Sequence, residues 1–366
     1  MIGKDSQGKH GRGRTTVRDI AQMLEISTAT VSRALSDRPG VSDEVRQRVR
    51  IVAQKTGYQG AQHTTLRSPV VVAMISEGSL VNDPFYPSIQ QAFERTMQRH
   101  RISTVMASFD GQDEQSISDI DHLCTDAWLA GFIIVGRIVR VDVIERIVAT
   151  DKPTIMIDNT LLPTRCTAIV PDNVHGAYRL TAHLIAHGAK RLSYVGGPQH
   201  CYSTQERMYG FLGALSDAQL SPHAIVLGSG TAVNDGLTAG ADLLDAPVPP
   251  DAVVAVNDAV ALGVLQTARD RGCRVPESLR ICGFDDIQWS RLSAPPLSTC
   301  RIDLEALGRV AAERMVTLLR HPAGRSGDDP QRIVLPVQPV FRESCGCDME
   351  KVQEGRVGVG TEERHG

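Results

Sequence analysis

The sequence predicts an α/β protein in which an N-terminal all-α head precedes two doubly wound parallel-sheet lobes. Residues 15–58 contain three short segments with the apolar spacing of helices. From residue 70 onward, strand-like runs rich in Val, Ile and Ala alternate with helical runs, as expected for parallel strands covered by helices on both faces. A chain of 366 residues is long enough for two or three such domains.

Each helix of the head begins at a residue that can cap it. A first helix is predicted over Val17–Leu24, where apolar residues recur at i, i+3, i+4 and i+7 and Thr16 supplies the capping hydroxyl. A second is predicted over Thr28–Leu35, after Ser27. A third follows Ser42 and has two acidic residues in its first turn, where the helix dipole favours them.

Two helices joined by a short turn, with a third that buries their shared face, form a helix-turn-helix. The second helix is narrow at its N-terminus and can enter a DNA major groove. There Arg33 can donate two hydrogen bonds to a guanine, while Thr28 and Ala29 can contact a thymine methyl group. Hydroxyl groups near the helix starts suit phosphate contacts, and they belong to Thr16, Ser27, Thr30, Ser32 and Ser42. The alternative is a structural three-helix bundle.

These residues resemble the DNA-binding head of the lactose-repressor (LacI/GalR) family. The matching segments are 19–21, 27, 30–35, 39–42 and 57–58. The resemblance implies that Thr28, Ala29 and Arg33 read bases. Glu25 stands where the family usually has Gly in the inter-helix turn, and a left-handed backbone there would cost about 1 kcal/mol. Arg67 stands where the family has a leucine that enters the minor groove, so a hinge helix at 59–67 is left open.

The charge of the chain is unevenly distributed. Residues 1–68 hold 12 Lys and Arg against 6 Asp and Glu, whereas the remainder holds 27 against 36. A basic head on an acidic body suits a protein that contacts phosphate with one end only. The chain shows neither an N-terminal apolar signal segment nor an apolar run of membrane-spanning length, so we expect a cytoplasmic protein.

The body is predicted to form two lobes because its strands are too numerous for one small sheet. The predicted strands are 70–76, 102–108, 131–136, 153–158, 167–172, 191–197, 224–228, 252–258, 279–286 and 332–337. The predicted helices are 87–100, 141–149, 174–187, 204–218, 235–244, 259–271 and 304–319.

Polar side chains recur at the carboxyl ends of these strands, where open parallel sheets bind ligands. For Asp158, Asn257 and Asp285 we favour contact with a small ligand that carries several hydroxyl or amino groups. A helix N-cap is the alternative for each of them. Asp172-Asn173 and Asp258 are expected to be caps.

The body also resembles the effector-binding core of the same family, which is similar to periplasmic sugar-binding proteins of type I. The matching segments are 82–86, 172–173, 196–198, 203–211, 257–263, 275–276, 283–286 and 341–345. The resemblance implies an effector cleft between one lobe of 69–160 and 291–329 and another of 161–290 and 330–345. By position, the effector-binding residues are Phe85, Asp158, Ser203, Arg207, Asn257 and Asp285. Arg207 would clamp the effector with its guanidinium, and Phe85 would form an apolar wall. Glu77 and Trp289 are weaker candidates.

The domain boundaries follow from these patterns. They are a disordered basic tail at 1–14, the DNA-binding head at 15–58, a hinge or linker at 59–68, a two-lobed effector-binding and dimerisation domain at 69–345, and a disordered tail at 346–366.

We expect a sequence-specific transcription regulator that a small molecule controls, and a repressor rather than an activator. Its expected partners are double-stranded operator DNA, a sugar, sugar acid or nucleoside effector, and a second copy of the chain in a homodimer or tetramer. A solute-binding protein without gene control is the alternative. The sequence offers no paired nucleophile and base and no phosphate-binding loop, so we expect no enzyme, catalytic residue or cofactor.

Two pairs of metal-binding residue types are assigned no ligand role. His183 and His187 stand at i, i+4, but no Glu follows His183 to complete an HExxH pattern, so we interpret them as ordinary helix positions. Cys345 and Cys347 are too close for common zinc spacing. We expect reduced thiols there, with a redox sensor as the alternative.

Overall fold

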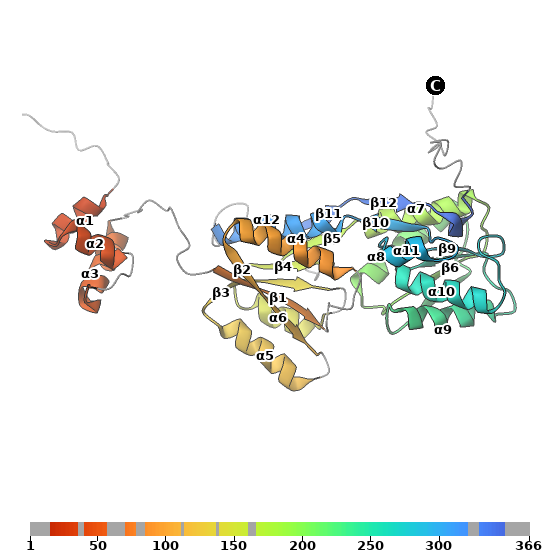
Figure 1. The fold of residues 1–366 in the computed structure, drawn as a ribbon, viewed down its shortest axis with the longest axis horizontal. Coiled ribbons are helices and arrows are strands. Elements are labelled where there is room, and N and C mark those ends of the chain that lie inside the picture. Colours follow the sequence, from red (N-terminus) through yellow and green to blue (C-terminus); the bar gives the residue numbers. More distant parts are fainter. Residues whose placement is uncertain are drawn as a thin grey trace, which may run out of the picture. The chain divides into compact units, whose positions relative to one another are not determined.

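The computed structural model describes residues 15–35, 40–56, 70–77, 85–110, 113–136, 139–159, 166–320 and 329–347 (Figure 1). The predicted tail at 1–14, the predicted hinge at 59–68 and residues 348–366 lie outside these ranges. For Glu77 the structure describes the backbone and not the side chain. The chain divides into two compact units, Met1–Ser68 and Pro69–Gly366.

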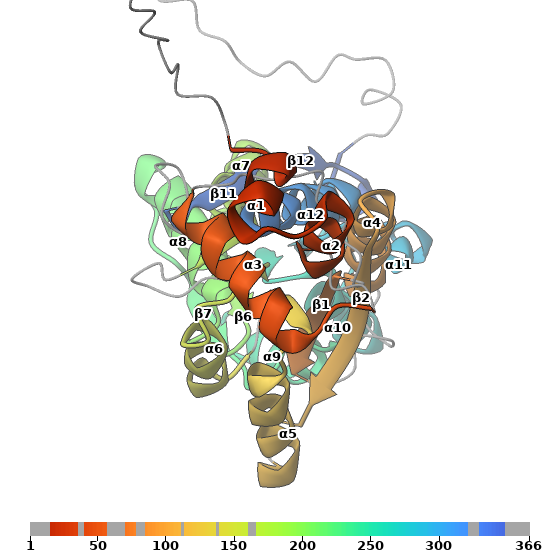
Figure 2. The same ribbon diagram turned by 90° about the vertical axis from the view of Figure 1, so that its left-hand side faces the viewer.

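The first unit contains the three predicted helices (Figure 2). They are α1 (Val17–Leu24), α2 (Thr28–Leu35) and α3 (Asp43–Lys55). The bounds of α1 and α2 agree with the prediction because their caps and apolar spacing are local signals. The fully buried side chains at the centre of this unit are Ile20, Val31, Ala34 and Val49.

The second unit has two lobes, and the first is built on a parallel sheet of order β11-β5-β4-β3-β1-β2. Its strands are β1 (Val70–Glu77), β2 (Ile102–Phe109), β3 (Leu129–Val135), β4 (Thr154–Ile157), β5 (Thr167–Pro171) and β11 (Arg332–Leu335). Helices α4 (Tyr86–Arg99) and α12 (Leu304–Arg320) pack together on one face, and α5 (Glu114–Thr125) and α6 (Val141–Val148) lie on the other (Figure 1). Alternate residues of β1 enter the two apolar clusters that these faces bury, as the pleat of a strand requires.

The second lobe is built on a smaller parallel sheet of order β7-β6-β8-β9. Its strands are β6 (Leu192–Gly196), β7 (Ala224–Leu227), β8 (Ala252–Ala255) and β9 (Arg280–Cys282). Its long helices pack in two pairs, α7 (Asn173–Ala186) with α8 (Tyr202–Asp217), and α9 (Val233–Leu244) with α10 (Asp258–Asp270). The short elements α11 (Gln288–Leu292), β10 (Thr299–Ile302), β12 (Val337–Val340) and η1 (Glu343–Cys345) complete it, and β10 pairs antiparallel with β12.

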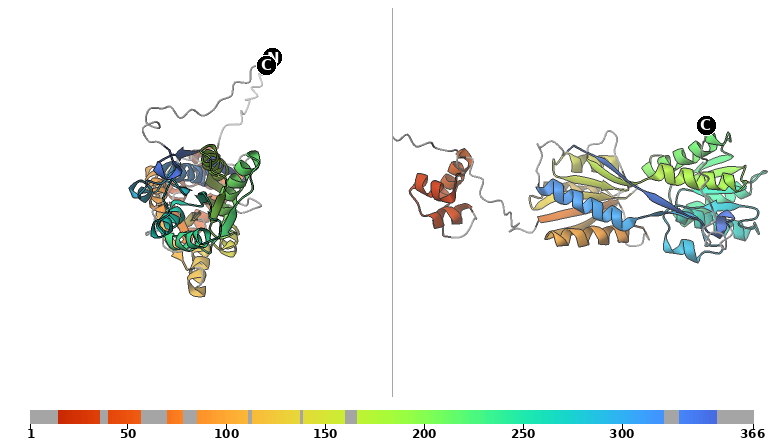
Figure 3. Two further views of the ribbon diagram at one scale, coloured as in Figure 1. Left: turned by 90° about the vertical axis from the view of Figure 1, so that its right-hand side faces the viewer. Right: turned by 90° about the horizontal axis from the view of Figure 1, so that it is seen from above.

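The expected division between the lobes is wrong in three places. We assigned 161–290 and 330–345 to the second lobe, but β5 and β11 pair with each other and extend the first sheet. We assigned 291–329 to the first lobe, but β10 pairs with β12 and belongs to the second. Within the described residues, the chain passes between the lobes after β5, between β10 and α12, and between β11 and β12 (Figure 3). A buried strand has the same apolar pattern in either sheet, so the sequence pattern alone does not assign it.

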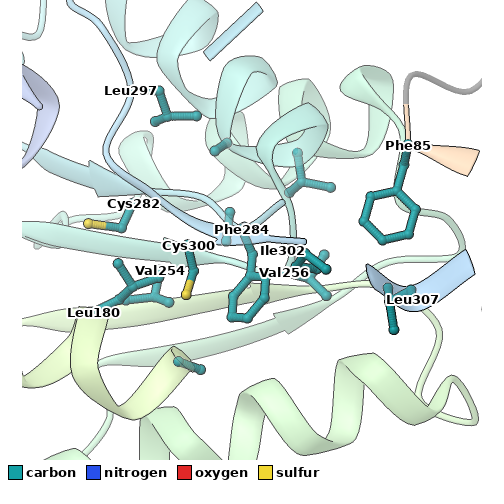
Figure 4. Packing of buried hydrophobic residues seen from close by; sticks show 14 of the residues in the cluster. Phe85, Leu180, Val254, Val256, Cys282, Phe284, Leu297, Cys300, Ile302 and Leu307 are labelled. Atoms are coloured by element: carbon teal, nitrogen blue, oxygen red, sulfur yellow. The ribbon is translucent and has the colours of Figure 1, made fainter. Parts of the chain in front are cut away.

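A cluster of buried apolar side chains continues from one lobe into the other. Figure 4 shows part of it, with Phe85 and Leu307 from the first lobe and Val256 and Phe284 from the second. None of the helices in the described ranges is both long and apolar enough to cross a membrane.

Candidate functional site

The outer face of α2 carries the predicted base-reading residues. Thr28, Ala29 and Arg33 are exposed, as is Ser32, while Val31 on the opposite face is fully buried. The prediction that these four side chains face away from the core is confirmed. Contact between them and DNA stays a prediction.

The predicted capping hydroxyls fix the helix starts. Thr16 Oγ1 accepts a hydrogen bond from the Asp19 N–H at 3.3 Å, and Asp19 Oδ2 accepts one from the Thr16 N–H at 2.7 Å. Ser27 Oγ accepts from the Thr30 N–H at 3.0 Å. Ser42 Oγ accepts from the Val45 N–H at 3.4 Å. The three caps are therefore confirmed, and they orient the hydroxyl groups that we predict to lie near phosphate.

Glu25 ends α1 in a left-handed conformation, with φ 56° and ψ 38°. Its N–H donates to the carbonyls of Ala21 and Gln22. The backbone at this position is therefore left-handed, and a residue with a Cβ atom adopts it at a cost of about 1 kcal/mol.

In the second lobe, the guanidinium of Arg207 lies among groups from three other segments. Arg207 is 1% exposed. Its Nε donates to Asn173 Oδ1 at 2.8 Å, and its Nη1 donates to the Val256 carbonyl at 2.5 Å. The same Nη1 lies 3.2 Å from Asp285 Oδ1, and Arg207 Cζ lies 3.8 Å from the centre of the Phe284 ring. The structure therefore brings two predicted effector residues, Arg207 and Asp285, into a buried ion pair.

The remaining nitrogen of this guanidinium is a buried donor that the fold does not use. Arg207 Nη2 has no hydrogen-bond partner among the residues that the structure describes. A buried donor without an acceptor costs about 1–3 kcal/mol, so such a group calls for an explanation. An acceptor atom of a ligand would satisfy it.

The two aspartates that follow β9 have different tasks. Asp285 faces Arg207 and has φ 112°, a left-handed backbone that is strained for any residue with a side chain. Asp286 binds Arg301 at 2.6 Å and also pairs with Arg342. Although burial opposes it, hydrogen bonds from Arg342 and Arg301 hold the pKa of Asp286 below its ordinary value. Asp286 therefore anchors the C-terminal segment, and Asp285 is left for the Arg207 site.

In the first lobe, Asp158 follows β4 and is 1% exposed. Asp158 Oδ2 accepts a hydrogen bond from the Tyr86 hydroxyl at 3.0 Å. Phe85 is also buried and packs edge-to-face against Tyr86, with ring centres 5.0 Å apart. The predicted residues Phe85 and Asp158 thus lie around Tyr86, whose role the sequence did not single out.

Asn257 does not have the environment that we expected. It caps α10, because its Oδ1 accepts from the Val260 N–H at 2.9 Å. Its Nδ2 donates to the Thr231 carbonyl at 3.0 Å. The side-chain amide is thus used by the fold at both ends, and we leave Asn257 out of the proposed binding set.

Asp258, which we expected to be a cap, is instead a fully buried acceptor. It accepts hydrogen bonds from the Ser290 hydroxyl at 2.6 Å, the Thr299 hydroxyl at 2.5 Å and the Ile287 N–H at 3.0 Å. Burial, followed by the nearby charge of Asp285, raises the pKa of Asp258 to about 7. Asn257 is therefore the cap that we expected Asp258 to be, and Asp258 is a buried structural acceptor.

The sequence also missed a bridge between the lobes. Asp172 caps α7 as expected, but Asn173 is buried and its Nδ2 donates to Glu206 Oε2 at 3.2 Å. Glu206 Oε1 accepts from Arg332 Nη2 at 2.6 Å, and Arg332 belongs to β11 of the first lobe. A line of polar contacts therefore runs from Arg332 through Glu206 and Asn173 to Arg207.

Two further candidates occupy less informative positions. Ser203 is buried in the first turn of α8, where its hydroxyl lies 3.5 Å from Cys201 Sγ. Trp289 lies on α11 and is 44% exposed.

A cavity of about 700 Å³ lies beside the segments that cross between the lobes, and it is lined by residues 301–306 and 335–338 and by Asp285. Asp285 is the predicted effector residue that this cavity shares with the Arg207 site.

Comparisons with known proteins agree with this architecture. Residues 16–60 match the sequence profile of bacterial regulatory proteins of the lacI family, and residues 181–345 match that of a periplasmic binding protein-like domain. The structure of a lac repressor dimer bound to operator and the anti-inducer ONPF superposes with a TM-score of 0.67. It is 23% identical and covers 91% of this chain and 99% of its own, so it supports the fold.

Two relatives are similar along almost their whole length. The HTH-type transcriptional repressor CytR of Escherichia coli K12 is 29% identical over 325 residues, which is 87% of this chain and 93% of CytR. The ribose operon repressor of Haemophilus influenzae is 28% identical over 337 residues, which is 90% of this chain and 98% of that repressor. With its helix-turn-helix head and its two-lobed body, this DNA-binding transcription regulator belongs to the lacI family of bacterial regulatory proteins.

Proposed function

We propose that this regulator acts in the cytoplasm as a homodimeric repressor of a near-palindromic operator, and that a small hydroxyl-rich effector bound between its lobes releases it. One helix-turn-helix head reads only a few base pairs, so two heads are needed for useful affinity and specificity. A two-fold dimer presents its heads to a two-fold site. The working parts are the head at 15–58, the hinge at 59–68 and the body at 69–345.

The exposed face of α2 carries the proposal for DNA. Arg33 projects from it next to Ser32 and one turn after Thr28 and Ala29, so a single groove can receive all four. The net charge of residues 1–68 is +6, which favours phosphate. The rest of the chain is acidic and does not attract phosphate.

Arg33→Ala tests this proposal. A forked contact to guanine is worth about 1–3 kcal/mol, so the substitution should weaken operator binding by about 5- to 150-fold and relax the preference at one base pair. The operator would first be selected from random DNA by the intact chain, and affinities would be measured by fluorescence anisotropy. Arg33→Lys is the matched control, because it keeps the charge and loses the fork. Equal affinity of the intact chain for operator and scrambled DNA would reject sequence-specific recognition.

The buried guanidinium of Arg207 supports the effector proposal. Its unused Nη2 donor and the carboxylates of Asp285 and Asp158 offer donors and acceptors suited to hydroxyl groups. The charge of Arg207 is already balanced by Asp285, so we rank neutral sugars first, then sugar acids, then nucleosides. The name of the ribose operon repressor among the relatives agrees with this order.

A thermal-shift panel of sugars, sugar acids and nucleosides tests the effector class. A ligand that binds the folded chain raises its unfolding temperature by mass action. The ligand that does so should also release the operator, since an effector acts only if it binds the two states with different affinity. A stabilising ligand that leaves operator affinity unchanged would favour a solute-binding role over regulation.

A further inference from the structure

Four side chains that the sequence assigned no shared role lie together at the end of α7. His183 lies in the last turn of that helix and His187 caps its C-terminus, while Cys345 and Cys347 follow β12. The sequence separates the two pairs by about 160 residues, as the residue numbers show. The ligand atoms of His183, His187 and Cys347 all lie within 4.8 Å of one another.

Four of the six distances between these atoms are close to the edges of a small tetrahedron. His183 Nε2 lies 3.3 Å from Cys345 Sγ and 3.2 Å from Cys347 Sγ, and the two sulfurs are 3.3 Å apart. His187 Nε2 lies 3.9 Å from Cys347 Sγ. Zinc bonds of about 2.3 Å to sulfur and about 2.0 Å to nitrogen place tetrahedral ligands about 3.3–3.8 Å apart. Shifts of a few tenths of an ångström would bring these four pairs to the spacing of tetrahedral zinc ligands.

The surroundings hold the histidine rings in orientations that suit metal ligation. His187 Nδ1 lies 2.9 Å from the His183 carbonyl oxygen. When Nδ1–H donates to that carbonyl, the lone pair is on Nε2, which is the nitrogen that faces the sulfurs. The ring of His183 stacks on Phe341, with centres 3.6 Å apart and planes 12° from parallel. Hydrogen bonds and apolar packing around the ligating side chains are typical of metal sites.

We propose that His183, His187, Cys345 and Cys347 bind one Zn²⁺ ion as a closed tetrahedral site. Two imidazole nitrogens and two thiolates suit a borderline-soft divalent ion, whereas Mg²⁺ and Ca²⁺ prefer oxygen. On binding, each cysteine loses its thiol proton to solvent and each histidine keeps one N–H, so the site becomes neutral overall. All four positions are filled by the protein, which is the mark of a structural site.

The ion would fasten the C-terminal segment to the helix that leads to the Arg207 site. Ser344 directly precedes Cys345, and its hydroxyl already donates to the Ile281 carbonyl of β9 at 2.7 Å. At its other end α7 begins with Asn173, which accepts the hydrogen bond from Arg207 Nε. Zinc would thus stabilise the second lobe, and the inference does not depend on the identity of the effector.

Cobalt substitution of the full-length chain tests the site. The chain would be reduced, stripped of metal with a chelator and titrated with Co²⁺. We expect the visible absorption of tetrahedral Co²⁺ and a near-ultraviolet thiolate-to-cobalt band, both saturating at one ion per chain and bleached by Zn²⁺. Zinc should also raise the unfolding temperature of the stripped chain, whereas Mg²⁺ should not.

Substitutions assign the ligands. Cys347→Ser and His187→Gln should each abolish the thiolate band or shift it strongly, and the zinc-dependent rise in unfolding temperature should be lost. The matched control is the double variant His122→Gln/Cys124→Ser on α5, which should keep the spectrum of the intact chain. Circular dichroism of each variant without metal reports that it is folded.

Three results would overturn the proposal, and the intact chain alone can give two of them. One is a fully reduced chain that shows no tetrahedral cobalt spectrum. The other is a Cys345–Cys347 disulfide that reforms when reductant is removed while the reduced pair binds no metal, which would assign the pair to redox chemistry instead. A His187→Gln variant with the spectrum of the intact chain would exclude that histidine as a ligand and with it the closed site.

Discussion

At the scale of single residues, the backbone conformation of Glu25 lowers the stability of the head. Its backbone is left-handed at φ 56°, a conformation that glycine adopts without the Cβ penalty. The turn is held by the Glu25 N–H, which donates to the carbonyls of Ala21 and Gln22. Nothing in these contacts requires a carboxylate.

Glu25→Gly should therefore stabilise the head by about 1 kcal/mol. Native-state hydrogen exchange at the buried positions Ile20, Val31 and Val49 in the full chain would measure the gain. Glu25→Ala is the control, because it removes the carboxylate and keeps the Cβ atom. An equal gain in both variants would show that the charge, rather than the backbone, carries the cost.

The buried carboxyl of Asp258 makes the stability of the second lobe depend on pH. Its pKa rises from an ordinary value of 3.8 to about 7, chiefly because of burial. Between these pH values the folded chain binds a proton that the unfolded chain does not. The free energy of unfolding should therefore fall as the pH rises through this range.

Asp258→Asn should flatten that part of the pH profile, because the amide does not titrate. Urea unfolding of the full chain at several pH values between 4 and 7 would give the slope, and the comparison of slopes does not depend on the absolute stability of the variant. Asp242→Asn, at an exposed position on α9, is the control and should keep the slope of the intact chain. A variant at Asp258 with an unchanged slope would contradict the buried titration.

The sequence predicted the candidate effector residues better than their roles. Arg207, Asp285 and Asp158 were chosen, and the structure buries all three. The partners that orient them were missed, because Asn173 resembles a cap in sequence and Tyr86 resembles a core aromatic residue. From sequence alone, either of two adjacent polar residues at a strand end can be the helix cap or the ligand-binding residue. The orientation of their side chains in the fold decides between the two roles.

At the scale of elements, the ion pair between β11 and α8 links the lobes. Arg332 is 40% exposed and Glu206 is 12% exposed, so solvent screens the pair and its worth lies below about 1 kcal/mol. Its position matters more than its strength. Glu206 also holds Asn173, which in turn orients Arg207.

Arg332→Ala should weaken effector binding by about two- to fivefold and leave operator affinity without effector unchanged. Titration calorimetry with the ligand found in the thermal-shift panel would measure the change. The control is Arg271→Ala, which breaks a pair with Asp245 away from the cavity. Equal effects of the two variants would show that general loss of surface charge explains the result.

Local signals explain which elements the sequence predicted. The head helices were found because Ser27 and Ser42 mark their starts, and most body strands were found because they are continuously apolar. Helix α5 was missed because it is mostly polar and buries little beyond Ile117 and Ile120. The partners of β5 and β11 are 164 residues apart in sequence, as the pairing of Ala168 with Arg332 shows, and no local pattern records such a pairing.

At the scale of the whole molecule, regulation requires that the effector site and the DNA-binding head communicate. The site lies entirely in the second compact unit, and the reading face of α2 lies in the first. Removing the effector contact should therefore separate the two activities.

Arg207→Ala should keep operator binding and abolish the response to the effector, as measured by fluorescence anisotropy with and without ligand. Because the substitution leaves Asp285 buried without its counter-ion, it should also destabilise the body by about 3–5 kcal/mol. The double variant Arg207→Ala/Asp285→Ala removes both charges and should recover part of that loss. A normal effector response in either variant would remove Arg207 from the proposed site.

The three passages of the chain between the lobes also govern its biosynthesis. The edge strand β11 of the first sheet and the strand β12, which pairs with β10, both lie within residues 332–340. Neither lobe is complete until this stretch has left the ribosome, so the nascent polypeptide carries two unfinished halves until then. A premature stop codon before this stretch would therefore damage both halves at once and leave the head joined to a receptor that does not close.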